Sequence, residues 1–523
     1  GSLDNVKSVF ASGGVTLTVS GSSAVDARIT NSTVAAADVK TVDAATAGSV
    51  NINTATSITG TASDIASVMA SSGVSHVAST LTATVDGASV DAADLIAINA
   101  NTDKAVAASA ATEITGTDDN IAAVLGASSQ ITINSAAPLT VDDGTASIAN
   151  VIIMSGTPVV TATVDSGVLA DLVHSTNGLP DSAKNILSIT VATTNVDPAD
   201  LTDLSGKTVS AVNVSNVTTL TGAASDAVAL YDAGSSDFTG LGNEAIVITG
   251  SPSASDLVAL SSDTSGNISL TSVSAISGTA ANLTTLLGNS SVINWDTNYP
   301  ALTVSGSSVS ADDVATLAAA VTSKYGSSNH TNKVDASGVG TFTGTADNIH
   351  TVLTSAVVNE AANPNVTLSD TTANAARLIT IKAETSGTID VSDATTVSGA
   401  GADVYTVLAT NYVTGLGTEA VTVTDTTLAA TTLTNIDSRT SGAIDASDVT
   451  TLTGSASEVN AAYAASTISG LGNESVSLND TNLAASELKT ADANTGGVVT
   501  AGSATAITGS AEDIADAFDA QDT

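Results

Sequence analysis

Cysteine is absent from the 523-residue sequence, which excludes disulfides and thiolate-bound metal ions. A chain without disulfides must derive its stability from buried apolar surface and hydrogen bonds. Large secreted bacterial proteins are often free of cysteine. We therefore expect an exported, extracellular protein.

Basic and aromatic residues are scarce. Twelve Lys and Arg residues stand against 52 Asp and Glu, the formal net charge is −40, and 2% of residues are aromatic. A surface this acidic repels nucleic acid and anionic lipid, so we expect neither as a partner. No apolar run reaches the roughly 18 residues that a membrane span needs, which argues against membrane insertion. The core must come from Val, Ile, Leu and Ala.

Familiar catalytic patterns are missing as well. The sequence has no HExxH, no P-loop and no G-x-S-x-G. The Gly-Leu-Gly stretches at 415–417 and 470–472 look like turns ahead of strands rather than nucleotide-binding loops. The four histidines fall in different repeats at unrelated positions: His76, His174, His330 and His350. We therefore expect no enzymatic activity.

One short pattern recurs along the whole chain. Residues 58–60 predict a short strand ending in glycine, and Thr61 with Asp64 fits the capping box that begins a helix. Apolar residues then follow at helical spacing, as Ile65, Val68 and Met69. The pattern returns at Ile114, Leu220, Ile276, Phe342, Val397, Leu452 and Ile507. Most of these copies are 55 or 56 residues apart, but the step is 66 residues before Phe342 and 106 before Leu220, where one worn copy lies near 164–173.

A second strand–helix unit lies between these copies. Residues 421–425 alternate like a strand, and Leu428, Leu433 and Ile436 form the stripe of a following helix. A further extended piece, such as residues 444–452, leads into the next Thr-Gly copy. Strands that alternate with one-sided helices at a fixed step predict parallel strands and right-handed crossovers. The predicted fold is an α/β elongated solenoid of strand-helix-strand-helix units with a parallel sheet.

This periodicity predicts how the chain is organised. We expect residues 1–523 to form a single repeat array of about nine units of about 55 residues, because no unit can bury its apolar stripe alone. A string of independent domains of this size is the weaker alternative, since such domains would be marginal without disulfides or metals. Gly1-Ser2 resembles a cloning scar, and both ends fall in mid-repeat, so we expect a piece of a longer array.

Acidic residues recur in one loop of the repeat. Asp390 with Asp393 and Asp445 with Asp448 occupy equivalent positions, and Asp335 matches in part. Carboxylates stacked in this way could bind Ca²⁺, which takes six to eight oxygen ligands. We favour the alternative that these are turn residues accepting hydrogen bonds from their own backbone. The calcium-binding nonapeptide GGxGxDxUx is missing.

Extra residues interrupt the repeat in three places, at 135–138, 289–300 and 323–330. Insertions in a solenoid map to loops on one face and can carry binding. Trp295 with Tyr299 could stack on a glycan. We favour a packing role for Trp295, either as a plug for a loop or as an end-packing residue.

In its Ser, Thr, Ala, Val and Asp runs and its Thr-Gly-Thr-Ala-x-[Asp/Asn]-Ile repeats, the chain resembles the repeat regions of large bacterial surface proteins. These include S-layer proteins and the very large adhesins of cyanobacteria and marine proteobacteria. The resemblance covers the whole length and implies a structural or adhesive role at the cell surface, without implying particular functional residues.

The function we expect is therefore structural: a segment of an extracellular bacterial surface protein, serving as surface layer, rod or filament material. The expected partner is another copy or neighbouring repeats, through end-to-end stacking. The main alternative is an adhesin or glycan-binding scaffold, for which Ca²⁺ is the candidate cofactor. A polysaccharide lyase is third, because it would need basic residues facing an acidic polymer and only twelve exist.

Overall fold

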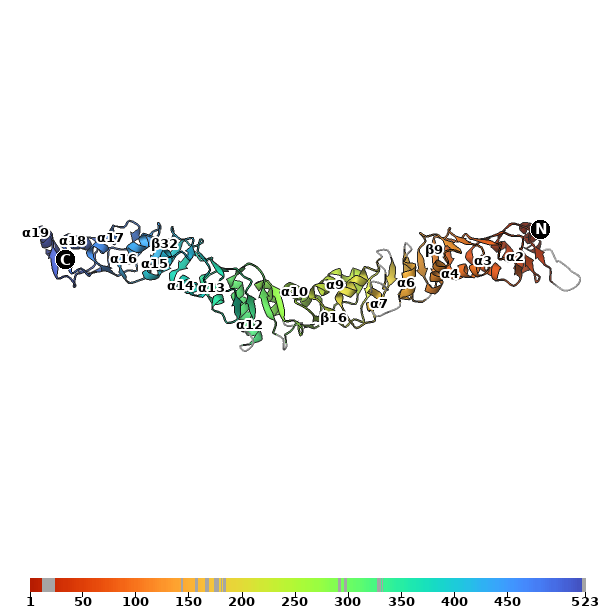
Figure 1. The fold of residues 1–523 in the computed structure, drawn as a ribbon, viewed down its shortest axis with the longest axis horizontal. Helices are drawn as coiled ribbons and strands as arrows, with labels where there is room; N and C mark the ends of the chain where they lie inside the picture. Colours follow the sequence, from red (N-terminus) through yellow and green to blue (C-terminus); the bar gives the residue numbers. More distant parts are fainter. Residues whose placement is uncertain are drawn as a thin grey trace. The chain divides into compact units, whose positions relative to one another are not determined.

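A computed structural model describes residues 1–11, 24–142, 144–155, 159–164, 169–173, 178–179, 181, 185–289, 293–295, 299–326, 331 and 333–519 (Figure 1). The chain divides into two compact units. The first contains Gly1–Thr249 with Ala259–Leu270, and the second contains Gly250–Val258 with Thr271–Thr523.

The first unit alternates short strands with short helices. Its helices are α1 (Leu3–Ala11), α2 (Ala36–Ala45), α3 (Ala62–Ala70), α4 (Ala92–Ala100), α5 (Asp118–Gly126), α6 (Ile148–Met154), α7 (Leu169–Val173), α8 (Pro198–Ser205) and α9 (Ala224–Asp237), while α10 (Ala254–Asp263) gives residues to both units. Its strands are β1 (Ala27–Arg28), β2 (Thr33–Ala35), β3 (Val50–Asn51), β4 (Ser57–Gly60), β5 (Val74–Ser75), β6 (Thr82–Val85), β7 (Ser89–Asp91), β8 (Val106–Ala108), β9 (Glu113–Gly116), β10 (Ile131–Ile133), β11 (Leu139–Val141), β12 (Val160–Thr163), β13 (Ile186–Ser188), β14 (Asn195–Val196), β15 (Val212–Asn213), β16 (Thr219–Gly222), β17 (Phe238–Thr239), β18 (Ala245–Ile248) and β19 (Ile268–Ser269).

The second unit repeats the same alternation. Its helices are α11 (Ala280–Gly288), α12 (Ala311–Tyr325), α13 (Ala346–Leu353), α14 (Ala375–Glu384), α15 (Gly401–Ala409), α16 (Ala430–Asp437), α17 (Ala456–Ala464), α18 (Ala485–Asn494) and α19 (Ala511–Asp519). Its strands are β20 (Ala275–Gly278), β21 (Ile293–Asn294), β22 (Ala301–Val304), β23 (Ser308–Ser310), β24 (Val334–Ala336), β25 (Thr341–Gly344), β26 (Val358–Glu360), β27 (Asn365–Leu368), β28 (Thr372–Asn374), β29 (Ile389–Asp390), β30 (Thr396–Gly399), β31 (Val413–Thr414), β32 (Ala420–Val423), β33 (Thr427–Ala429), β34 (Ile444–Asp445), β35 (Thr451–Gly454), β36 (Ile468–Ser469), β37 (Ser475–Leu478), β38 (Asn482–Ala484), β39 (Val499–Thr500) and β40 (Ala506–Thr508).

Both units pair their strands in parallel. We call the stretch of chain from one strand to the strand it pairs with a coil, and each coil stacks on the next. Ser57 of β4 pairs with Thr82 of β6, and Thr396 of β30 pairs with Ala420 of β32, so these coils take up somewhat less than half a sequence period. In Figure 1, α13 to α18 follow one another in sequence order along the second unit, and consecutive helices contact each other. The structure thus confirms the α/β solenoid of repeating strand–helix units with parallel sheets.

Each sheet crosses the boundary between sequence periods. In the order β28-β30-β32-β34-β36, β30 carries the Thr-Gly pattern, β32 is the second strand of the same period, and β34 is the extended piece before the next copy. Two residues of that predicted extended piece, Ile444 and Asp445, form β34, and a turn then leads into β35. Because one sheet joins strands from consecutive periods, a period within either unit cannot complete its sheet alone.

The Thr-Gly pattern has a steric cause at its glycine. Gly60 ends β4 with a φ of 145°, and a Cβ placed there would lie 3.2 Å from the Cβ of Ala36 at the start of α2. Gly399 repeats this arrangement, with a φ of 147° and a distance of 3.3 Å to Ala375. Residues with a side chain rarely adopt this backbone conformation, so the turn between strand and helix requires glycine.

The helix caps agree with the sequence in part. Thr61 Oγ1 accepts a hydrogen bond from the backbone N–H of Asp64 at 3.2 Å. The reciprocal bond of a full capping box forms at α17, where Glu458 Oε2 accepts from the backbone N–H of Ser455 at 2.8 Å. The shorter Asp64 carboxylate instead pairs with Lys40 of α2 at 2.8 Å. The capping pattern therefore also supplies acids that link neighbouring helices.

The core consists of small aliphatic side chains at the predicted stripe positions. Ile58, Ile65 and Val68 are at most 2% exposed, and so are Leu452 and Val459 in a later copy. At about 25 cal/mol per Å² of apolar area, each such side chain contributes about 1.5–3 kcal/mol. Among the helices of the described residues, none is both long and apolar enough to cross a membrane.

Candidate functional site

Three of the five acids considered as calcium ligands form turns. Asp335 Oδ1 accepts from the backbone N–H of Ser337 at 3.1 Å, Asp390 Oδ1 from that of Ser392 at 3.0 Å, and Asp445 Oδ1 from that of Ser447 at 3.0 Å. At Asp335 the Ser337 hydroxyl and amide and the Asn359 amide hold the pKa of the carboxyl below its usual range, although burial opposes them. The interpretation of these residues as turn formers is confirmed.

Asparagine accepts the same turn hydrogen bond in other copies of the repeat. Asn51 Oδ1 accepts from the backbone N–H of Asn53 at 3.0 Å, and Asn213 Oδ1 from that of Ser215 at 3.0 Å. Because a neutral amide replaces the carboxylate, these turns need an acceptor oxygen and not a charge.

The sheet order keeps equivalent acids apart. Asp390 lies in β29 beside Thr367 and Thr414, and Asp445 lies in β34 of a different sheet. Asp393 and Asp448 are exposed beside these turns. Over the part of the chain that the structure describes, no three His, Asp or Glu side chains gather as a metal site. Calcium binding at Asp335, Asp390, Asp393, Asp445 and Asp448 stays a prediction.

The histidines and the tryptophan lie in separate places. His76 Nε2 lies 3.0 Å from the carbonyl oxygen of Asn101, and His350 is on α13, while His174 and His330 lie outside the described residues. Trp295 is 8% exposed and packs against Tyr325, with ring centroids 6.1 Å apart. Its ring is therefore a plug rather than an open stacking face. Residues 290–292, 296–298 and 327–330 of the insertions lie outside the described part.

Three buried glutamates form a structural motif that the sequence analysis overlooked. Glu244, Glu419 and Glu474 each follow a Gly-Leu-Gly turn and are at most 7% exposed. In each case Oε2 accepts from the backbone N–H of the second glycine, for example Gly417 at 2.6 Å. The repeated Gly-Leu-Gly-x-Glu pattern was the available signal. The carboxylate closes the turn ahead of a strand.

A second overlooked motif joins one coil to the next. Asp370, Asp425 and Asp480 each accept, through Oδ2, a hydrogen bond from the first backbone N–H of a helix in the preceding coil. The donors are Ala346, Gly401 and Ala456, at 2.7, 2.6 and 2.7 Å. The carboxylate also faces the positive end of the helix dipole, which favours it there. These acids act as helix caps supplied by the neighbouring coil.

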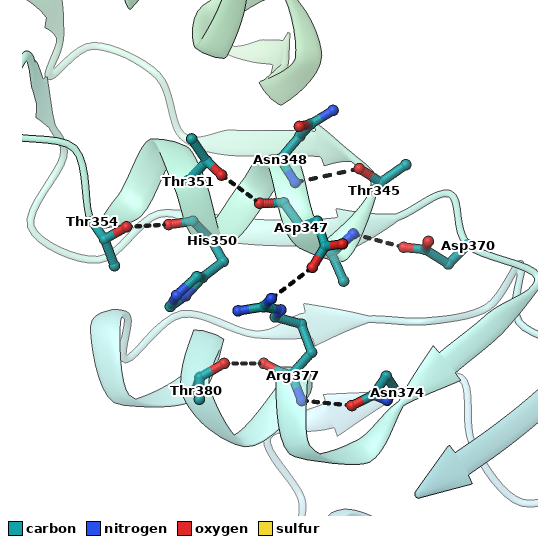
Figure 2. Close-up of polar contacts among 11 residues, drawn as sticks. Thr345, Asp347, Asn348, His350, Thr351, Thr354, Asp370, Asn374, Arg377 and Thr380 are labelled. Carbon is teal, nitrogen blue, oxygen red and sulfur yellow. Dashed lines mark hydrogen bonds and ion pairs between the residues drawn. The ribbon is translucent and has the colours of Figure 1, made fainter.

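Around the first of these caps lies a solvent-open pocket of about 350 Å³ in the second unit. Arg377 reaches from α14 towards Asp347 at the start of α13, and Nη2 lies 2.8 Å from Asp347 Oδ1 (Figure 2). Asn374 caps α14, since its Oδ1 accepts from the backbone N–H of Arg377 at 3.0 Å. Asp370, Thr372 and Thr380 complete the polar wall.

This pocket departs from the repeat. One period later, positions 347, 374 and 377 correspond to Ala402, Ala429 and Thr432, and two periods later to Ser457, Ala484 and Glu487. The helices nevertheless form in all three copies. The Arg377–Asp347 pair is therefore not required for a coil to fold, and it marks the best candidate for a binding site. Its only signal in the sequence was a departure from the repeat.

No protein-family model matches the chain, and a search of curated proteins finds no match.

Proposed function

We propose that this chain is a structural segment of an extracellular bacterial surface protein, in which stacked coils provide surface-layer, rod or filament material. The resemblance of its repeats and composition to S-layer proteins and large adhesins supports this role. So does a fold in which parallel strands and consecutive helices of the described residues pack coil on coil. The acidic surface is consistent with an extracellular setting.

The apolar surface of the last described coil carries the proposal. Leu452 and Val459 are fully buried because later coils cover them. At the equivalent positions Ile507 and Ile514 are only partly buried, and Phe518 of α19 is 56% exposed. An apolar groove of about 260 Å³ opens there, lined by Leu488, Ile507 and Phe518 among others.

A coil of the same kind is the natural cover for this surface. Repeat proteins bury each apolar face against the next repeat. We infer that a coil of the same kind, from a second copy of the chain or from neighbouring repeats, occupies the groove. Self-association through this surface would extend the array.

Sedimentation velocity over a range of protein concentrations tests this role. The weight-average sedimentation coefficient should rise with concentration, and Phe518→Asp should abolish the rise because it places a charge in the groove. Val209→Asp is the matched control, since Val209 is 58% exposed in the first unit. A strictly monomeric wild type, with and without Ca²⁺, would refute the proposal, and continued assembly of Phe518→Asp would refute the interface.

A further inference from the structure

We propose that the Arg377 pocket binds a neutral saccharide, with one sugar ring seated between the start of α13 and the start of α14. The inference is independent of the structural role, because it concerns one coil of the second unit and not the stacking of coils.

The first argument is the supply of free donors. A guanidinium carries five N–H groups, and in the described structure Arg377 uses one nitrogen, Nη2, on Asp347. The side chain of Arg377 is 34% exposed, so its guanidinium is partly open to solvent and to a ligand. Asn374 accepts through Oδ1, which leaves its amide N–H groups for a ligand.

The second argument is the supply of free acceptors beside those donors. Asp370 binds the backbone N–H of Ala346 through Oδ2 alone, and Asp347 binds Arg377 through Oδ1 alone. Each carboxylate therefore keeps one oxygen for a ligand. A sugar hydroxyl donates and accepts at once, so a wall that offers both kinds of group suits a polyol.

The third argument is charge. Two carboxylates and one guanidinium give the pocket a formal charge of −1, on a chain whose net charge is −40. A carboxylated or sulfated sugar would be repelled. A cationic sugar would be attracted by the net charge but would lie beside the Arg377 guanidinium. Neutral hexoses meet neither penalty. The methyl groups of Ala346 and Ala376 line the same pocket and can contact the C–H face of a sugar ring.

The size of the pocket is adequate for one ring. Small-ligand pockets usually measure about 300–1,000 Å³, and this one measures about 350 Å³. Because the pocket is open and has no aromatic wall, binding should be weak and should gain strength through multiple copies of the chain on a surface.

Saturation-transfer-difference NMR on the full chain tests the inference. The neutral probes are glucose, galactose, mannose and N-acetylglucosamine. Glucuronic acid, an anion, and glucosamine, a cation, are the charged sugars used for comparison. We expect a signal from at least one neutral sugar that changes little with salt. Arg377→Thr should weaken it about tenfold or more, as expected for losing a hydrogen bond to a charged group.

The repeat itself provides the controls. The triple variant Asp347→Ala, Asn374→Ala and Arg377→Thr gives these three positions the residues of the following copy, whose helices α15 and α16 are formed, so it should fold and should not bind. Arg439→Thr removes an exposed arginine elsewhere and should bind normally. The inference is overturned by signals from charged sugars alone, by an equal loss in Arg439→Thr, or by no neutral sugar giving an Arg377-dependent signal.

Discussion

Asp425→Ala should loosen helix α15 more than Asp480→Ala loosens helix α17. Both carboxylates cap a helix of the preceding coil, Asp425 at Gly401 and Asp480 at Ala456. The N-cap residue of α15, Ala400, offers no side-chain cap, so Asp425 is the acceptor that holds the first turn of this helix. Helix α17 also has the complete capping box described above.

The expected loss in the local stability of each helix can be estimated from these contacts. A hydrogen bond to a charged group contributes about 1.5–3 kcal/mol, and a carboxylate near a helix N-terminus adds about 0.3–1 kcal/mol. We therefore expect Asp425→Ala to cost about 2 kcal/mol in the local stability of α15. Asp480→Ala should cost about 1 kcal/mol, because two other groups still bind the first turn of α17.

Hydrogen exchange measured by mass spectrometry resolves the two helices. A loss of about 2 kcal/mol corresponds to roughly 30-fold faster exchange in peptides from α15, against about fivefold for α17 in Asp480→Ala. Asp393→Ala removes an exposed carboxylate near α15 and should leave its exchange unchanged. Equal effects in α15 and α17, or an effect of Asp393→Ala on α15, would refute the reasoning.

The remaining predictions concern turns, glycine and pH. Asp390→Asn should change the melting temperature little, because the turn needs only an acceptor oxygen. Asp390→Ala removes that acceptor and should lower the free energy of unfolding by about 1 kcal/mol. Stability that depends on Ca²⁺ and is lost in Asp390→Asn would instead indicate a metal site. In urea titrations Gly399→Ala should destabilise by more than about 1 kcal/mol because of its positive φ, while Gly288→Ala, with open space around it, should not. The lowered pKa of Asp335 means that the folded state binds its proton less tightly than the unfolded state. Its contribution is therefore complete above its ordinary value of 3.8 and is lost as the pH falls through the folded pKa, so melting temperatures should drop less between pH 5 and pH 3 in Asp335→Asn.

Local patterns in the sequence predicted the local structure well. Thr61 with Asp64 marks the start of α3, and Leu433 and Ile436 lie buried on α16 as their spacing indicates. These features depend on residues a few positions apart, where spacing alone decides which side chains share a face. The turn role of Asp390 follows from the same local logic.

Features that connect one coil to the next were harder to predict. Strands pair at a step shorter than half of the sequence period, as for Thr396 and Ala420. The step between paired strands is set by how the chain winds and not by which residues recur. For this reason the partner of Asp425, Gly401, could not be identified from the repeat, although the acid itself recurs. Arg377 was missed because a repeat analysis emphasises what copies share.

Cysteine cross-linking of outward-facing residues in one sheet tests the stacked, parallel register most directly. The natural chain has no cysteine, so there is no background. Thr427 pairs with Thr451, and Thr451 pairs with Ser475, in adjacent strands β33, β35 and β37. The double variants Thr427→Cys with Thr451→Cys and Thr451→Cys with Ser475→Cys should form disulfides on mild oxidation. Thr427→Cys with Ser475→Cys should not, because two strand spacings of about 4.8 Å exceed the reach of a disulfide. Efficient cross-linking of that last pair, with none between neighbours, would contradict the coil stacking described above.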